Sequence, residues 1–340
     1  MKNRPGVVLR FSIVILIALA LGLPACSPKS TPTQTLTPIT VQLLWTHNAT
    51  FSGFYAADQQ GYYAADQQGY YAAEGLAVTF IEGGATVDLI APVLSGTAQF
   101  GIAGADALLL ARSDGKPVRA IAIIDRRSPI VFGALTNSGI TRPQDFVGKI
   151  IRVVPQIAPS LHAMMERVGI PRDQYTEVTL PSEVAAFDSG QAQVWGLYLN
   201  NFVITLQQTG HELNFIYPDD YGVHFYGDTL FTTDEMIATQ PDQVLRFLRA
   251  TLKGWTWAIE NVDKTGALVQ KYNPNVDPVI EIAKMTASLP LVNTGEDHIG
   301  WMKSDVWAGM EQMLRQQGVL TAPLDVTQMY TMQFLEEIYK

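Results

Sequence analysis

Aromatic and polar residues gather where predicted strands end, and their side chains suit the recognition of a flat, largely uncharged heteroaromatic ring. Aromatic faces stack on such a ring, and amide and hydroxyl groups pair with its hydrogen-bond donors and acceptors. In open α/β sheets, ligands bind in loops beyond the carboxyl ends of the strands. Four segments have this placement: Trp45-Thr46-His47-Asn48, GIAGAD at Gly101–Asp106, Pro155–Ser160 and Tyr198–Phe202, which follows a strand that contains Trp195.

Each of the four segments also has an ordinary structural explanation, because Asn and Ser cap helices and Trp fills cores. Because there are four such segments, two in each predicted half of the body, ligand binding is as good an explanation for them as helix capping and core packing. None of them concentrates Arg or Lys, so a phosphate or sulfonate would lack a charged clamp. Helix N-terminal amides alone can hold anions, however, so anionic ligands stay an alternative.

Enzyme signatures are missing from the sequence. There is no GxSxG turn, no GxxxxGK[ST] loop and no GxGxxG after a predicted strand. We therefore expect a protein that is not an enzyme and that needs no cofactor and no metal. The five histidines are scattered, without the close spacing of paired metal ligands: His47, His162, His211, His224 and His298.

The N-terminus has the pattern of a bacterial export signal. Its apolar run of 13 residues is too short for a bilayer core of ~30 Å, which needs about 20 residues. The run ends at Leu23-Pro24-Ala25-Cys26, which resembles a lipobox, so we expect residues 1–25 to be removed and Cys26 to be acylated. An anchor helix with an incidental cysteine is the alternative. The signal comprises three basic residues and the apolar run: Lys2, Arg4, Arg10 and Phe11–Leu23.

Residues 26–39 are rich in Ser, Thr and Pro and have no apolar period, which predicts a flexible tether. Stable anchoring takes more than one acyl chain, and lipoprotein processing places several on the terminal cysteine. We therefore expect the body to be tied by lipid, palmitate among its chains, to the extracytoplasmic face of the cell membrane.

The composition indicates a folded globular chain, since 47% of the 340 residues are hydrophobic and only 16% are charged. The length suggests about two domains. The net charge of −9 repels phosphate backbones and excludes a nucleic-acid partner. The single cysteine leaves no intramolecular disulfide and no thiolate metal cluster.

Short β-rich runs alternate with helical patterns from Thr40 onward, which is typical of an α/β fold with mostly parallel sheets. After about Thr233 the pattern is helical to the end. The expected strands are Val41–Trp45, Ala77–Glu82, Gln99–Ala103, Val118–Ile123, Ile130–Leu135, Lys149–Val154, Glu177–Leu180, Gln193–Leu197, Asn214–Tyr217 and Thr229–Thr232. The expected helices are Val87–Ser95, Asp106–Arg112, Ser160–Val168, Glu183–Ser189, Phe202–Gln208, Gln240–Asn261, Lys264–Tyr272, Asp277–Leu289, Ser304–Gln317 and Thr327–Tyr339.

An octapeptide, YAADQQGY, occurs twice in tandem at Tyr55–Tyr62 and Tyr63–Tyr70. A period this short is not that of a solenoid, which stacks several longer units. On a continuous helix, eight added residues would rotate everything after them by roughly 80° beyond two full turns. We therefore expect an extra surface turn, with the core paired normally on either side.

Five segments carry a family resemblance that covers nearly all of Thr40–Gln317. Together they resemble the type II substrate-binding proteins related to thiamine-pyrimidine synthase. The segments are VQLLWTHNATFSGFYAADQQGYYAAEGL (with one octapeptide removed), APVLSGTAQFGIAGADALLLARSDGKPVRAIAII, GITRPQDFVGKIIRVV, QAQVWGLYLNN and PDQVLRFLRATLKGWTWAIEN.

The resemblance implies a two-lobed type II periplasmic-binding fold with a helical C-terminal region. Two hinge strands would join the lobes, which close around a ligand and deliver it to the permease of an ABC importer. Crossings near Phe132–Leu135 and Phe225–Thr229 would make lobe 1 discontinuous, with residues 40–133 plus 228–340, and would leave 134–227 as lobe 2. We expect the protein itself to be a monomer.

The family's characteristic ligands are formylaminopyrimidine, a thiamine precursor, and, in some lipoproteins, riboflavin. Phe202 stands where pyrimidine-binding members tend to carry a glutamate. The phenyl group removes an acceptor that an aminopyrimidine would use and suits the dimethylbenzene edge of riboflavin, so we favour riboflavin. The candidate ligand-binding residues are Trp45, Asn48, Tyr55 or its repeat copy Tyr63, Asp106, Trp195, Tyr198, Asn200 and Phe202.

Two other functions stay as alternatives. Capture of an alkanesulfonate or nitrate would need anion-binding loops, and the apolar Ile157-Ala158-Pro159 argues against it. An enzyme like the pyrimidine synthase would carry a cysteine-rich motif and a cofactor lysine. The sequence has a single cysteine, which the export signal already uses.

Overall fold

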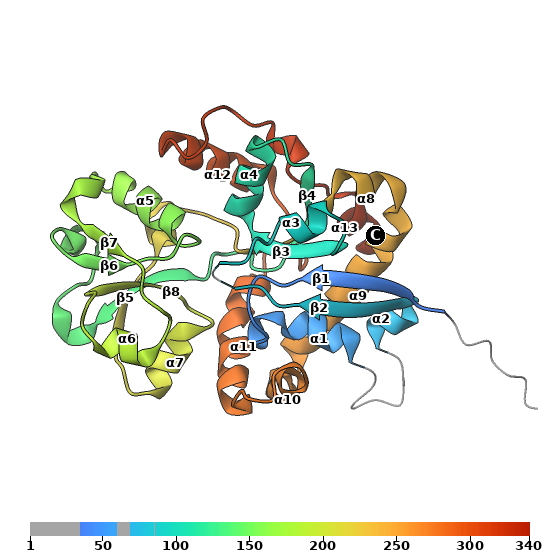
Figure 1. The fold of residues 1–340 in the computed structure, drawn as a ribbon, viewed down its shortest axis with the longest axis horizontal. Coiled ribbons are helices and arrows are strands. Elements are labelled where there is room, and N and C mark those ends of the chain that lie inside the picture. The colour runs from blue at the N-terminus through green and yellow to red at the C-terminus, as the bar shows by residue number, and fades with distance from the viewer. Residues whose placement is uncertain (1–34, 60–68, 85) are drawn as a thin grey trace, which may run out of the picture. The chain divides into compact units, whose positions relative to one another are not determined.

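The computed structural model describes residues 35–59, 69–84 and 86–340, and Thr35–Lys340 form one compact unit. This unit is built on two five-stranded sheets, with strand orders β2-β1-β3-β10-β4 and β7-β6-β8-β5-β9 (Figure 1). The strands are β1 (Thr37–Gln42), β2 (Leu76–Ile81), β3 (Phe100–Gly104), β4 (Val118–Ile123), β5 (Ile130–Leu135), β6 (Ile150–Arg152), β7 (Thr176–Val178), β8 (Val194–Tyr198), β9 (Leu213–Ile216) and β10 (Asp228–Thr233).

Each sheet is parallel except around one strand. β1 pairs in parallel with β2 and β3, and β6 pairs in parallel with β7 and β8. β10 runs antiparallel to both of its neighbours, and so does β5. β5 is the strand by which the chain enters the second sheet, and β10 is the strand by which it returns to the first. In each sheet this entering strand runs antiparallel to its neighbours. The expected two-lobed α/β class is confirmed, but the sheets are mixed rather than mostly parallel.

The chain crosses between the sheets at residues 124–129 and 222–227. The first crossing lies before the expected Phe132–Leu135, because all of β5 already pairs within the second sheet: Ile130–Gly133 lie opposite β8, and Phe132–Leu135 lie opposite β9. The second crossing overlaps the expected Phe225–Thr229.

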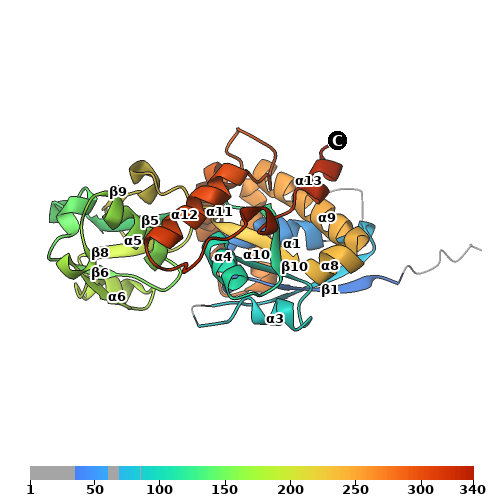
Figure 2. The ribbon, with the colours of Figure 1, turned by 90° about the horizontal axis from the view of Figure 1, so that it is seen from above.

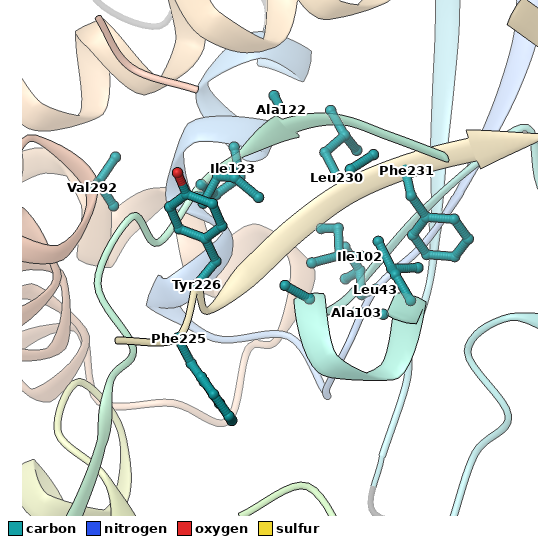
Figure 3. Close-up of a cluster of buried hydrophobic side chains, with 14 of the residues drawn as sticks. Leu43, Ile102, Ala103, Ala122, Ile123, Phe225, Tyr226, Leu230, Phe231 and Val292 are labelled. Carbon is teal, nitrogen blue, oxygen red and sulfur yellow. The ribbon is translucent and has the colours of Figure 1, made fainter. Parts of the chain in front are cut away.

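The second crossing is packed against the core of the first sheet. Ile102 of β3, Ile123 of β4 and Leu230 of β10 are fully buried around it, as Figure 3 shows. Phe225 and Tyr226 of the crossing are also buried, and the Tyr226 hydroxyl accepts a hydrogen bond of 2.9 Å from the backbone N–H of Lys303. This connection is therefore held by apolar burial and not by loop geometry alone.

The C-terminal third is helical, as expected, and two of its helices reach the second sheet's helices (Figure 2). α9 contacts α1, α2 and α13, whereas α11 contacts α7 and α12 contacts α5. Among the described residues, no helix combines the length and the apolar character needed to cross a membrane. The helices are α1 (Ser52–Asp58), α2 (Tyr70–Ala73), α3 (Ala91–Leu94), α4 (Ala105–Ser113), α5 (Ala158–Arg167), α6 (Val184–Asp188), α7 (Phe202–Gln208), α8 (Asp234–Thr239), α9 (Pro241–Glu260), α10 (Val262–Tyr272), α11 (Pro278–Val292), α12 (Ser304–Gln316) and α13 (Gln333–Ile338).

β1 begins at Thr37, four residues before the strand expected at Val41–Trp45. It pairs with β2 over its full length, and the backbone N–H of Thr37 donates to the carbonyl oxygen of Gly75 at 2.8 Å. The last three residues of the tether predicted at 26–39 therefore belong to the sheet. The predicted signal peptide at 1–25 and the acylation site Cys26 lie outside the described residues.

Two expected helices are shorter in the structure, because other hydrogen-bond partners take the backbone groups that a longer helix would use. Of Val87–Ser95 only α3 is helical, and the Asp88 carboxylate accepts from the backbone N–H groups of Ile90 and Ala91 at its start. Of Thr327–Tyr339 only α13 is α-helical, because residues 329–331 pair with the backbone of β4. The sequence did not predict α1, α2 and α8. α1 includes the start of the first repeat copy, and the turn expected within the repeat falls largely on residues 60–68, outside the described part.

α1 and α9 touch through two glycines. A Cβ on Gly53 would lie 2.2 Å from the Trp255 ring, and a Cβ on Gly254 would lie 2.2 Å from the carbonyl oxygen of Gly53. Such distances leave no room for a methyl group, so this helix contact requires glycine on both sides.

The variant Gly254→Ala should lower the free energy of unfolding by about 1–3 kcal/mol, because the added methyl group forces apart a packed contact. Urea unfolding measures this change. Gly309→Ala is the matched control: it lies in α12 with no atom within 4 Å of its would-be Cβ, so it should keep wild-type stability or gain up to about 1 kcal/mol. Equal stability of Gly254→Ala and wild type would contradict the packing.

Candidate ligand-binding site

A cavity of about 750 Å³ lies between the loops of the two sheets. Its wall includes residues that follow the carboxyl ends of β1, β4, β6, β7 and β8, which is where open α/β sheets bind ligands. The volume is within the roughly 300–1,000 Å³ of pockets for drug-sized ligands. The first sheet's loops and crossings supply Leu44, Trp45, Asn48, Thr50, Phe51, Asp125, Pro129 and Asp228. The second supplies Arg152, Val154, Gln156, Ile157, Thr179–Val184, Leu197, Tyr198, Asn200–Phe202 and Thr205.

Aromatic side chains line the cavity from both sheets. Trp45 and Phe51 belong to the connection between β1 and α1, whereas Tyr198 and Phe202 flank the connection between β8 and α7. Burial raises the pKa of the Tyr198 hydroxyl, and nearby Asp228 adds to the increase. The hydroxyl is therefore neutral at ordinary pH, and no hydrogen-bond partner for it is found in the described part of the chain. These four side chains can enclose a flat ring and offer it one free hydroxyl.

The two predicted asparagines line the cavity, but their amides also have structural partners. Asn48 caps the turn after β1: its Oδ1 accepts from the Thr50 N–H and its Nδ2 donates to the Thr46 carbonyl, both at 2.8 Å. Asn200 donates from Nδ2 to the Ser288 hydroxyl at 3.0 Å, and its amide acts to lower the pKa of Asp125. Asn200 thus joins the β8–α7 loop to α11.

Tyr55 does not line the cavity. It is fully buried, its hydroxyl lies 2.7 Å from His47 Nδ1, and its ring stacks on Tyr272 with 4.1 Å between centroids. Its burial raises its pKa. Tyr55 therefore supports the loop that carries Trp45. The repeat copy Tyr63 lies outside the described residues.

Trp195 and Asp106 are also outside the cavity wall. Side chains alternate along a strand, and Trp195 faces α6, where its ring packs 5.2 Å from Phe187 and its Nε1 donates to the Ala192 carbonyl. Asp106 lies in the first turn of α4, and burial raises its pKa to about 6, while nearby backbone N–H groups oppose the rise. The structure gives Trp195 a core position and places Asp106 at the start of a helix.

Arg152 lines the cavity, although no predicted loop contained it. Its guanidinium donates to the carbonyl oxygens of Leu180 and Gly196, both at 2.9 Å, and to the Ser182 hydroxyl at 2.7 Å. It also lies 5.3 Å from the centre of the Trp195 ring, and burial lowers its pKa. Its bonds organise the β7–α6 loop, so the cavity does contain one cation, contrary to the expectation drawn from the loops alone.

Sequence reasoning missed three carboxyl groups that line the cavity, those of Asp125, Glu183 and Asp228, of which the first and the last are buried. Asp125 follows β4 and Asp228 begins β10, and they are 3% and 7% exposed. Burial raises the pKa of Asp228 to about 7. Burial, with the Asp228 charge adding to it, also raises the pKa of Asp125, while the bond from Asn200 opposes the rise. The sequence places each of these two buried acids next to an apolar predicted strand, which could have marked both as candidates. Their proximity to each other could not be predicted, because it arises only where the chain crosses between the sheets.

The described residues contain no group of three or more His, Cys, Asp and Glu side chains that could hold a metal ion. His162, His211 and His224 instead pair singly with Glu177, Asp188 and Asp219, at 2.6–2.7 Å. The cavity wall offers a ligand aromatic faces, carboxyl groups, amides, the Tyr198 hydroxyl and one guanidinium.

Comparison with known proteins gives matches along most of the chain. The model of the family described as NMT1/THI5 like matches residues 48–265, more than half of the chain. The riboflavin-binding protein RibY of Chloroflexus aurantiacus is 26% identical over 92% of this chain and 91% of its own. A formylaminopyrimidine-binding protein of Halalkalibacterium halodurans is 27% identical over 90% of this chain and 95% of its own.

Two further matches bear on fold and activity. The periplasmic aliphatic sulphonate binding protein SsuA of Escherichia coli superposes with a TM-score of 0.67 at 13% identity, over 86% of this chain and 91% of its own. This likeness confirms the expected periplasmic-binding-protein fold. A relative in Legionella pneumophila, 24% identical over 71% of this chain and 77% of its own, is named as a 4-amino-5-hydroxymethyl-2-methylpyrimidine phosphate synthase.

The raised pKa of Asp228 predicts a pH dependence of stability. The folded chain holds this proton more tightly than the unfolded chain, so stability falls as pH rises from about 4 through about 7. Asp228→Asn cannot ionise, so at pH 8 its free energy of unfolding should exceed that of wild type by more than about 1 kcal/mol. Near pH 4 the difference should vanish.

Urea unfolding at both pH values measures this effect. Asp220→Asn is the control, because it removes the same charge from an exposed position and should leave stability within about 0.5 kcal/mol at both. If the Asp228→Asn variant is less stable than wild type at pH 8, the prediction is wrong and the fold stabilises the Asp228 carboxylate.

Proposed function

Because the chain belongs to the NMT1/THI5-like family, we propose that it is a substrate-binding protein that captures riboflavin and delivers it to the permease of an ABC importer. The observation that carries this proposal is the aromatic wall of the cavity. Trp45 and Phe51 lie on one side and Tyr198 and Phe202 on the other, so loops from both sheets can hold one flat ring.

The size of the cavity supports riboflavin over a single-ring pyrimidine. A three-ring isoalloxazine with its ribityl chain suits a pocket of about 750 Å³, whereas a pyrimidine would leave much of that volume to water. Phe202 adds an apolar surface for the dimethylbenzene edge. Formylaminopyrimidine is the second candidate, because the carboxyl groups of Asp125 and Asp228 could accept hydrogen bonds from its amino group.

Sulfonate capture and catalysis are less well supported. The cavity carries the carboxyl groups of Asp125, Asp228 and Glu183 against the single guanidinium of Arg152, which already bonds protein acceptors. An anion would be attracted weakly there. For catalysis, the chain has one cysteine, whereas the synthase-like enzymes that it resembles use a cysteine-rich motif.

We also propose that Cys26 carries lipid and ties the protein to the extracytoplasmic face of the cell membrane. The basic residues, the short apolar run and the LPAC sequence of the N-terminus support this location. Binding outside the membrane fits a protein that hands a vitamin to a permease.

Titration of the mature chain, residues 27–340, into riboflavin tests the ligand. Stacking on Trp or Tyr quenches flavin fluorescence, so saturable one-to-one quenching is expected. Trp45→Ala and Tyr198→Ala should each raise the Kd at least about tenfold, since each removes one face of the ring site.

Trp257→Ala is the matched control, because Trp257 lies on α9 beside Lys264 and does not line the cavity. Its Kd should match that of wild type. Wild-type affinity in both cavity variants would refute the ring site. Binding of formylaminopyrimidine without any flavin quenching would replace riboflavin as the ligand and leave the carrier role in place.

Cys26→Ala should release the protein from membranes, because the acylated side chain is lost. Fractionation of cells grown with labelled palmitate measures the acylation of the protein and its release from the membrane in one experiment. Membrane retention of an unlabelled wild-type chain would show that the apolar run itself is the anchor.

A further inference from the structure

Asp125 and Asp228 are held side by side by backbone hydrogen bonds between the two crossings. The Gly227 N–H donates to the Asp125 carbonyl at 2.8 Å, and the N–H groups of Ile124 and Asp125 donate to the Asp228 carbonyl at 2.7 and 3.2 Å. Both side chains line the cavity and both are more than nine-tenths buried. The two carboxyl groups therefore occupy adjacent, backbone-fixed positions at the place where the chain passes between the sheets.

The two groups differ in their polar surroundings. The Asn200 amide, whose Nδ2 donates to Ser288, lies near Asp125 and favours its ionised form. The carboxyl of Asp228 meets no hydrogen-bond donor in the part of the chain that the structure describes. A buried acceptor without a donor costs free energy, so Asp228 is suited to a donor that arrives from the cavity.

No cation neutralises this pair among the described residues. Other buried acids of the fold have such partners: Glu281 pairs with Lys284 at 2.7 Å, and Glu311 pairs with Arg315 at 2.8 Å. The one guanidinium of the described cavity wall, that of Arg152, donates hydrogen bonds to two carbonyls and a hydroxyl of the second lobe. The pair therefore has no structural ion pair that would explain its burial.

We propose that Asp125 and Asp228 determine the ligand specificity of the cavity by accepting hydrogen bonds from two neighbouring O–H or N–H donors of the ligand. This inference rests on the proposed function and narrows the ligand class. A compound that only stacks on the aromatic wall is a poor ligand, and one that also presents adjacent donors is a good one. In riboflavin these donors are the ribityl hydroxyls; in an aminopyrimidine they belong to the ring edge.

The pair of carboxyl groups would also discriminate against ligands that carry a negative charge. An anionic substituent is repelled by either carboxyl group when that group is ionised. A ligand without donors also leaves the two groups unpaired, so the hydrogen bonds that would offset their burial are lost. The aromatic wall then supplies contact area, and the carboxyl pair supplies the choice among ligands of similar shape.

Calorimetric titration with riboflavin and with lumiflavin, which lacks the ribityl hydroxyls, tests this inference on the mature chain. Wild type should prefer riboflavin by at least about tenfold, because riboflavin adds hydrogen bonds to two buried acceptors that lumiflavin leaves unpaired. Asp228→Asn should raise the riboflavin Kd at least about tenfold and leave the lumiflavin Kd within about twofold. An equal loss for both flavins would place the donors on the ring and still support the pair.

Two further variants complete the comparison. Asp125→Asn keeps an acceptor for Asn200 and should also weaken riboflavin preferentially, so the inference does not depend on one variant. Asp220→Asn removes the same charge from an exposed site and should bind both flavins as wild type does. Cooperative urea unfolding of each variant shows that it is folded.

The outcomes separate this inference from the proposed ligand. If wild type binds riboflavin but Asp228→Asn and Asp125→Asn bind both flavins with unchanged Kd, riboflavin capture stands and the carboxyl pair is not a specificity determinant. If wild type binds no flavin but binds formylaminopyrimidine, riboflavin is wrong. The same variants are then compared on that ligand and its analogue without the amino group, where an equal Kd in variants and wild type overturns the inference.

Discussion

The rest of the structure depends on one constraint, which is that the chain passes from the first sheet to the second and back again. β5 enters the second sheet and β10 returns to the first, each antiparallel to its neighbours. The two crossings are hydrogen-bonded to each other at Asp125 and Asp228, and the second is packed by Phe225 and Tyr226. Because the crossings lie between the sheets, the loops at the carboxyl ends of strands in both sheets face one cavity.

The part of the site that could be predicted from sequence is the part set by local pattern. Apolar periodicity locates strand ends, and Trp45, Tyr198 and Phe202, which follow strands, do line the cavity. Trp195 lies outside the cavity wall, because alternation along β8 decides which face a side chain takes, and only the register in the sheet reveals that face. Asp125, Asp228 and Arg152 were missed for a different reason. They reach the cavity through the crossings and through pairing between distant segments, which no local window contains.

The fold and the site carry different information about function. The same architecture occurs in SsuA at 13% identity, and relatives near 26% identity are named for riboflavin or for formylaminopyrimidine. Ligand choice must therefore come from a few side chains on a shared frame. In this chain we propose that those side chains are the aromatic wall from both sheets and the carboxyl pair of Asp125 and Asp228. The wall would favour a flat ring, and the pair would favour a ligand that carries adjacent donors.

The crystal structure of the mature chain with riboflavin would test the central claim most directly. We expect the isoalloxazine ring in the cavity between Trp45 and Tyr198, with ligand donors within about 3 Å of the Asp228 carboxyl. A flavin bound elsewhere, for example in the groove formed by His162, Tyr175 and Gln317, would contradict the account. So would a flavin in the cavity whose polar groups all face away from Asp125 and Asp228.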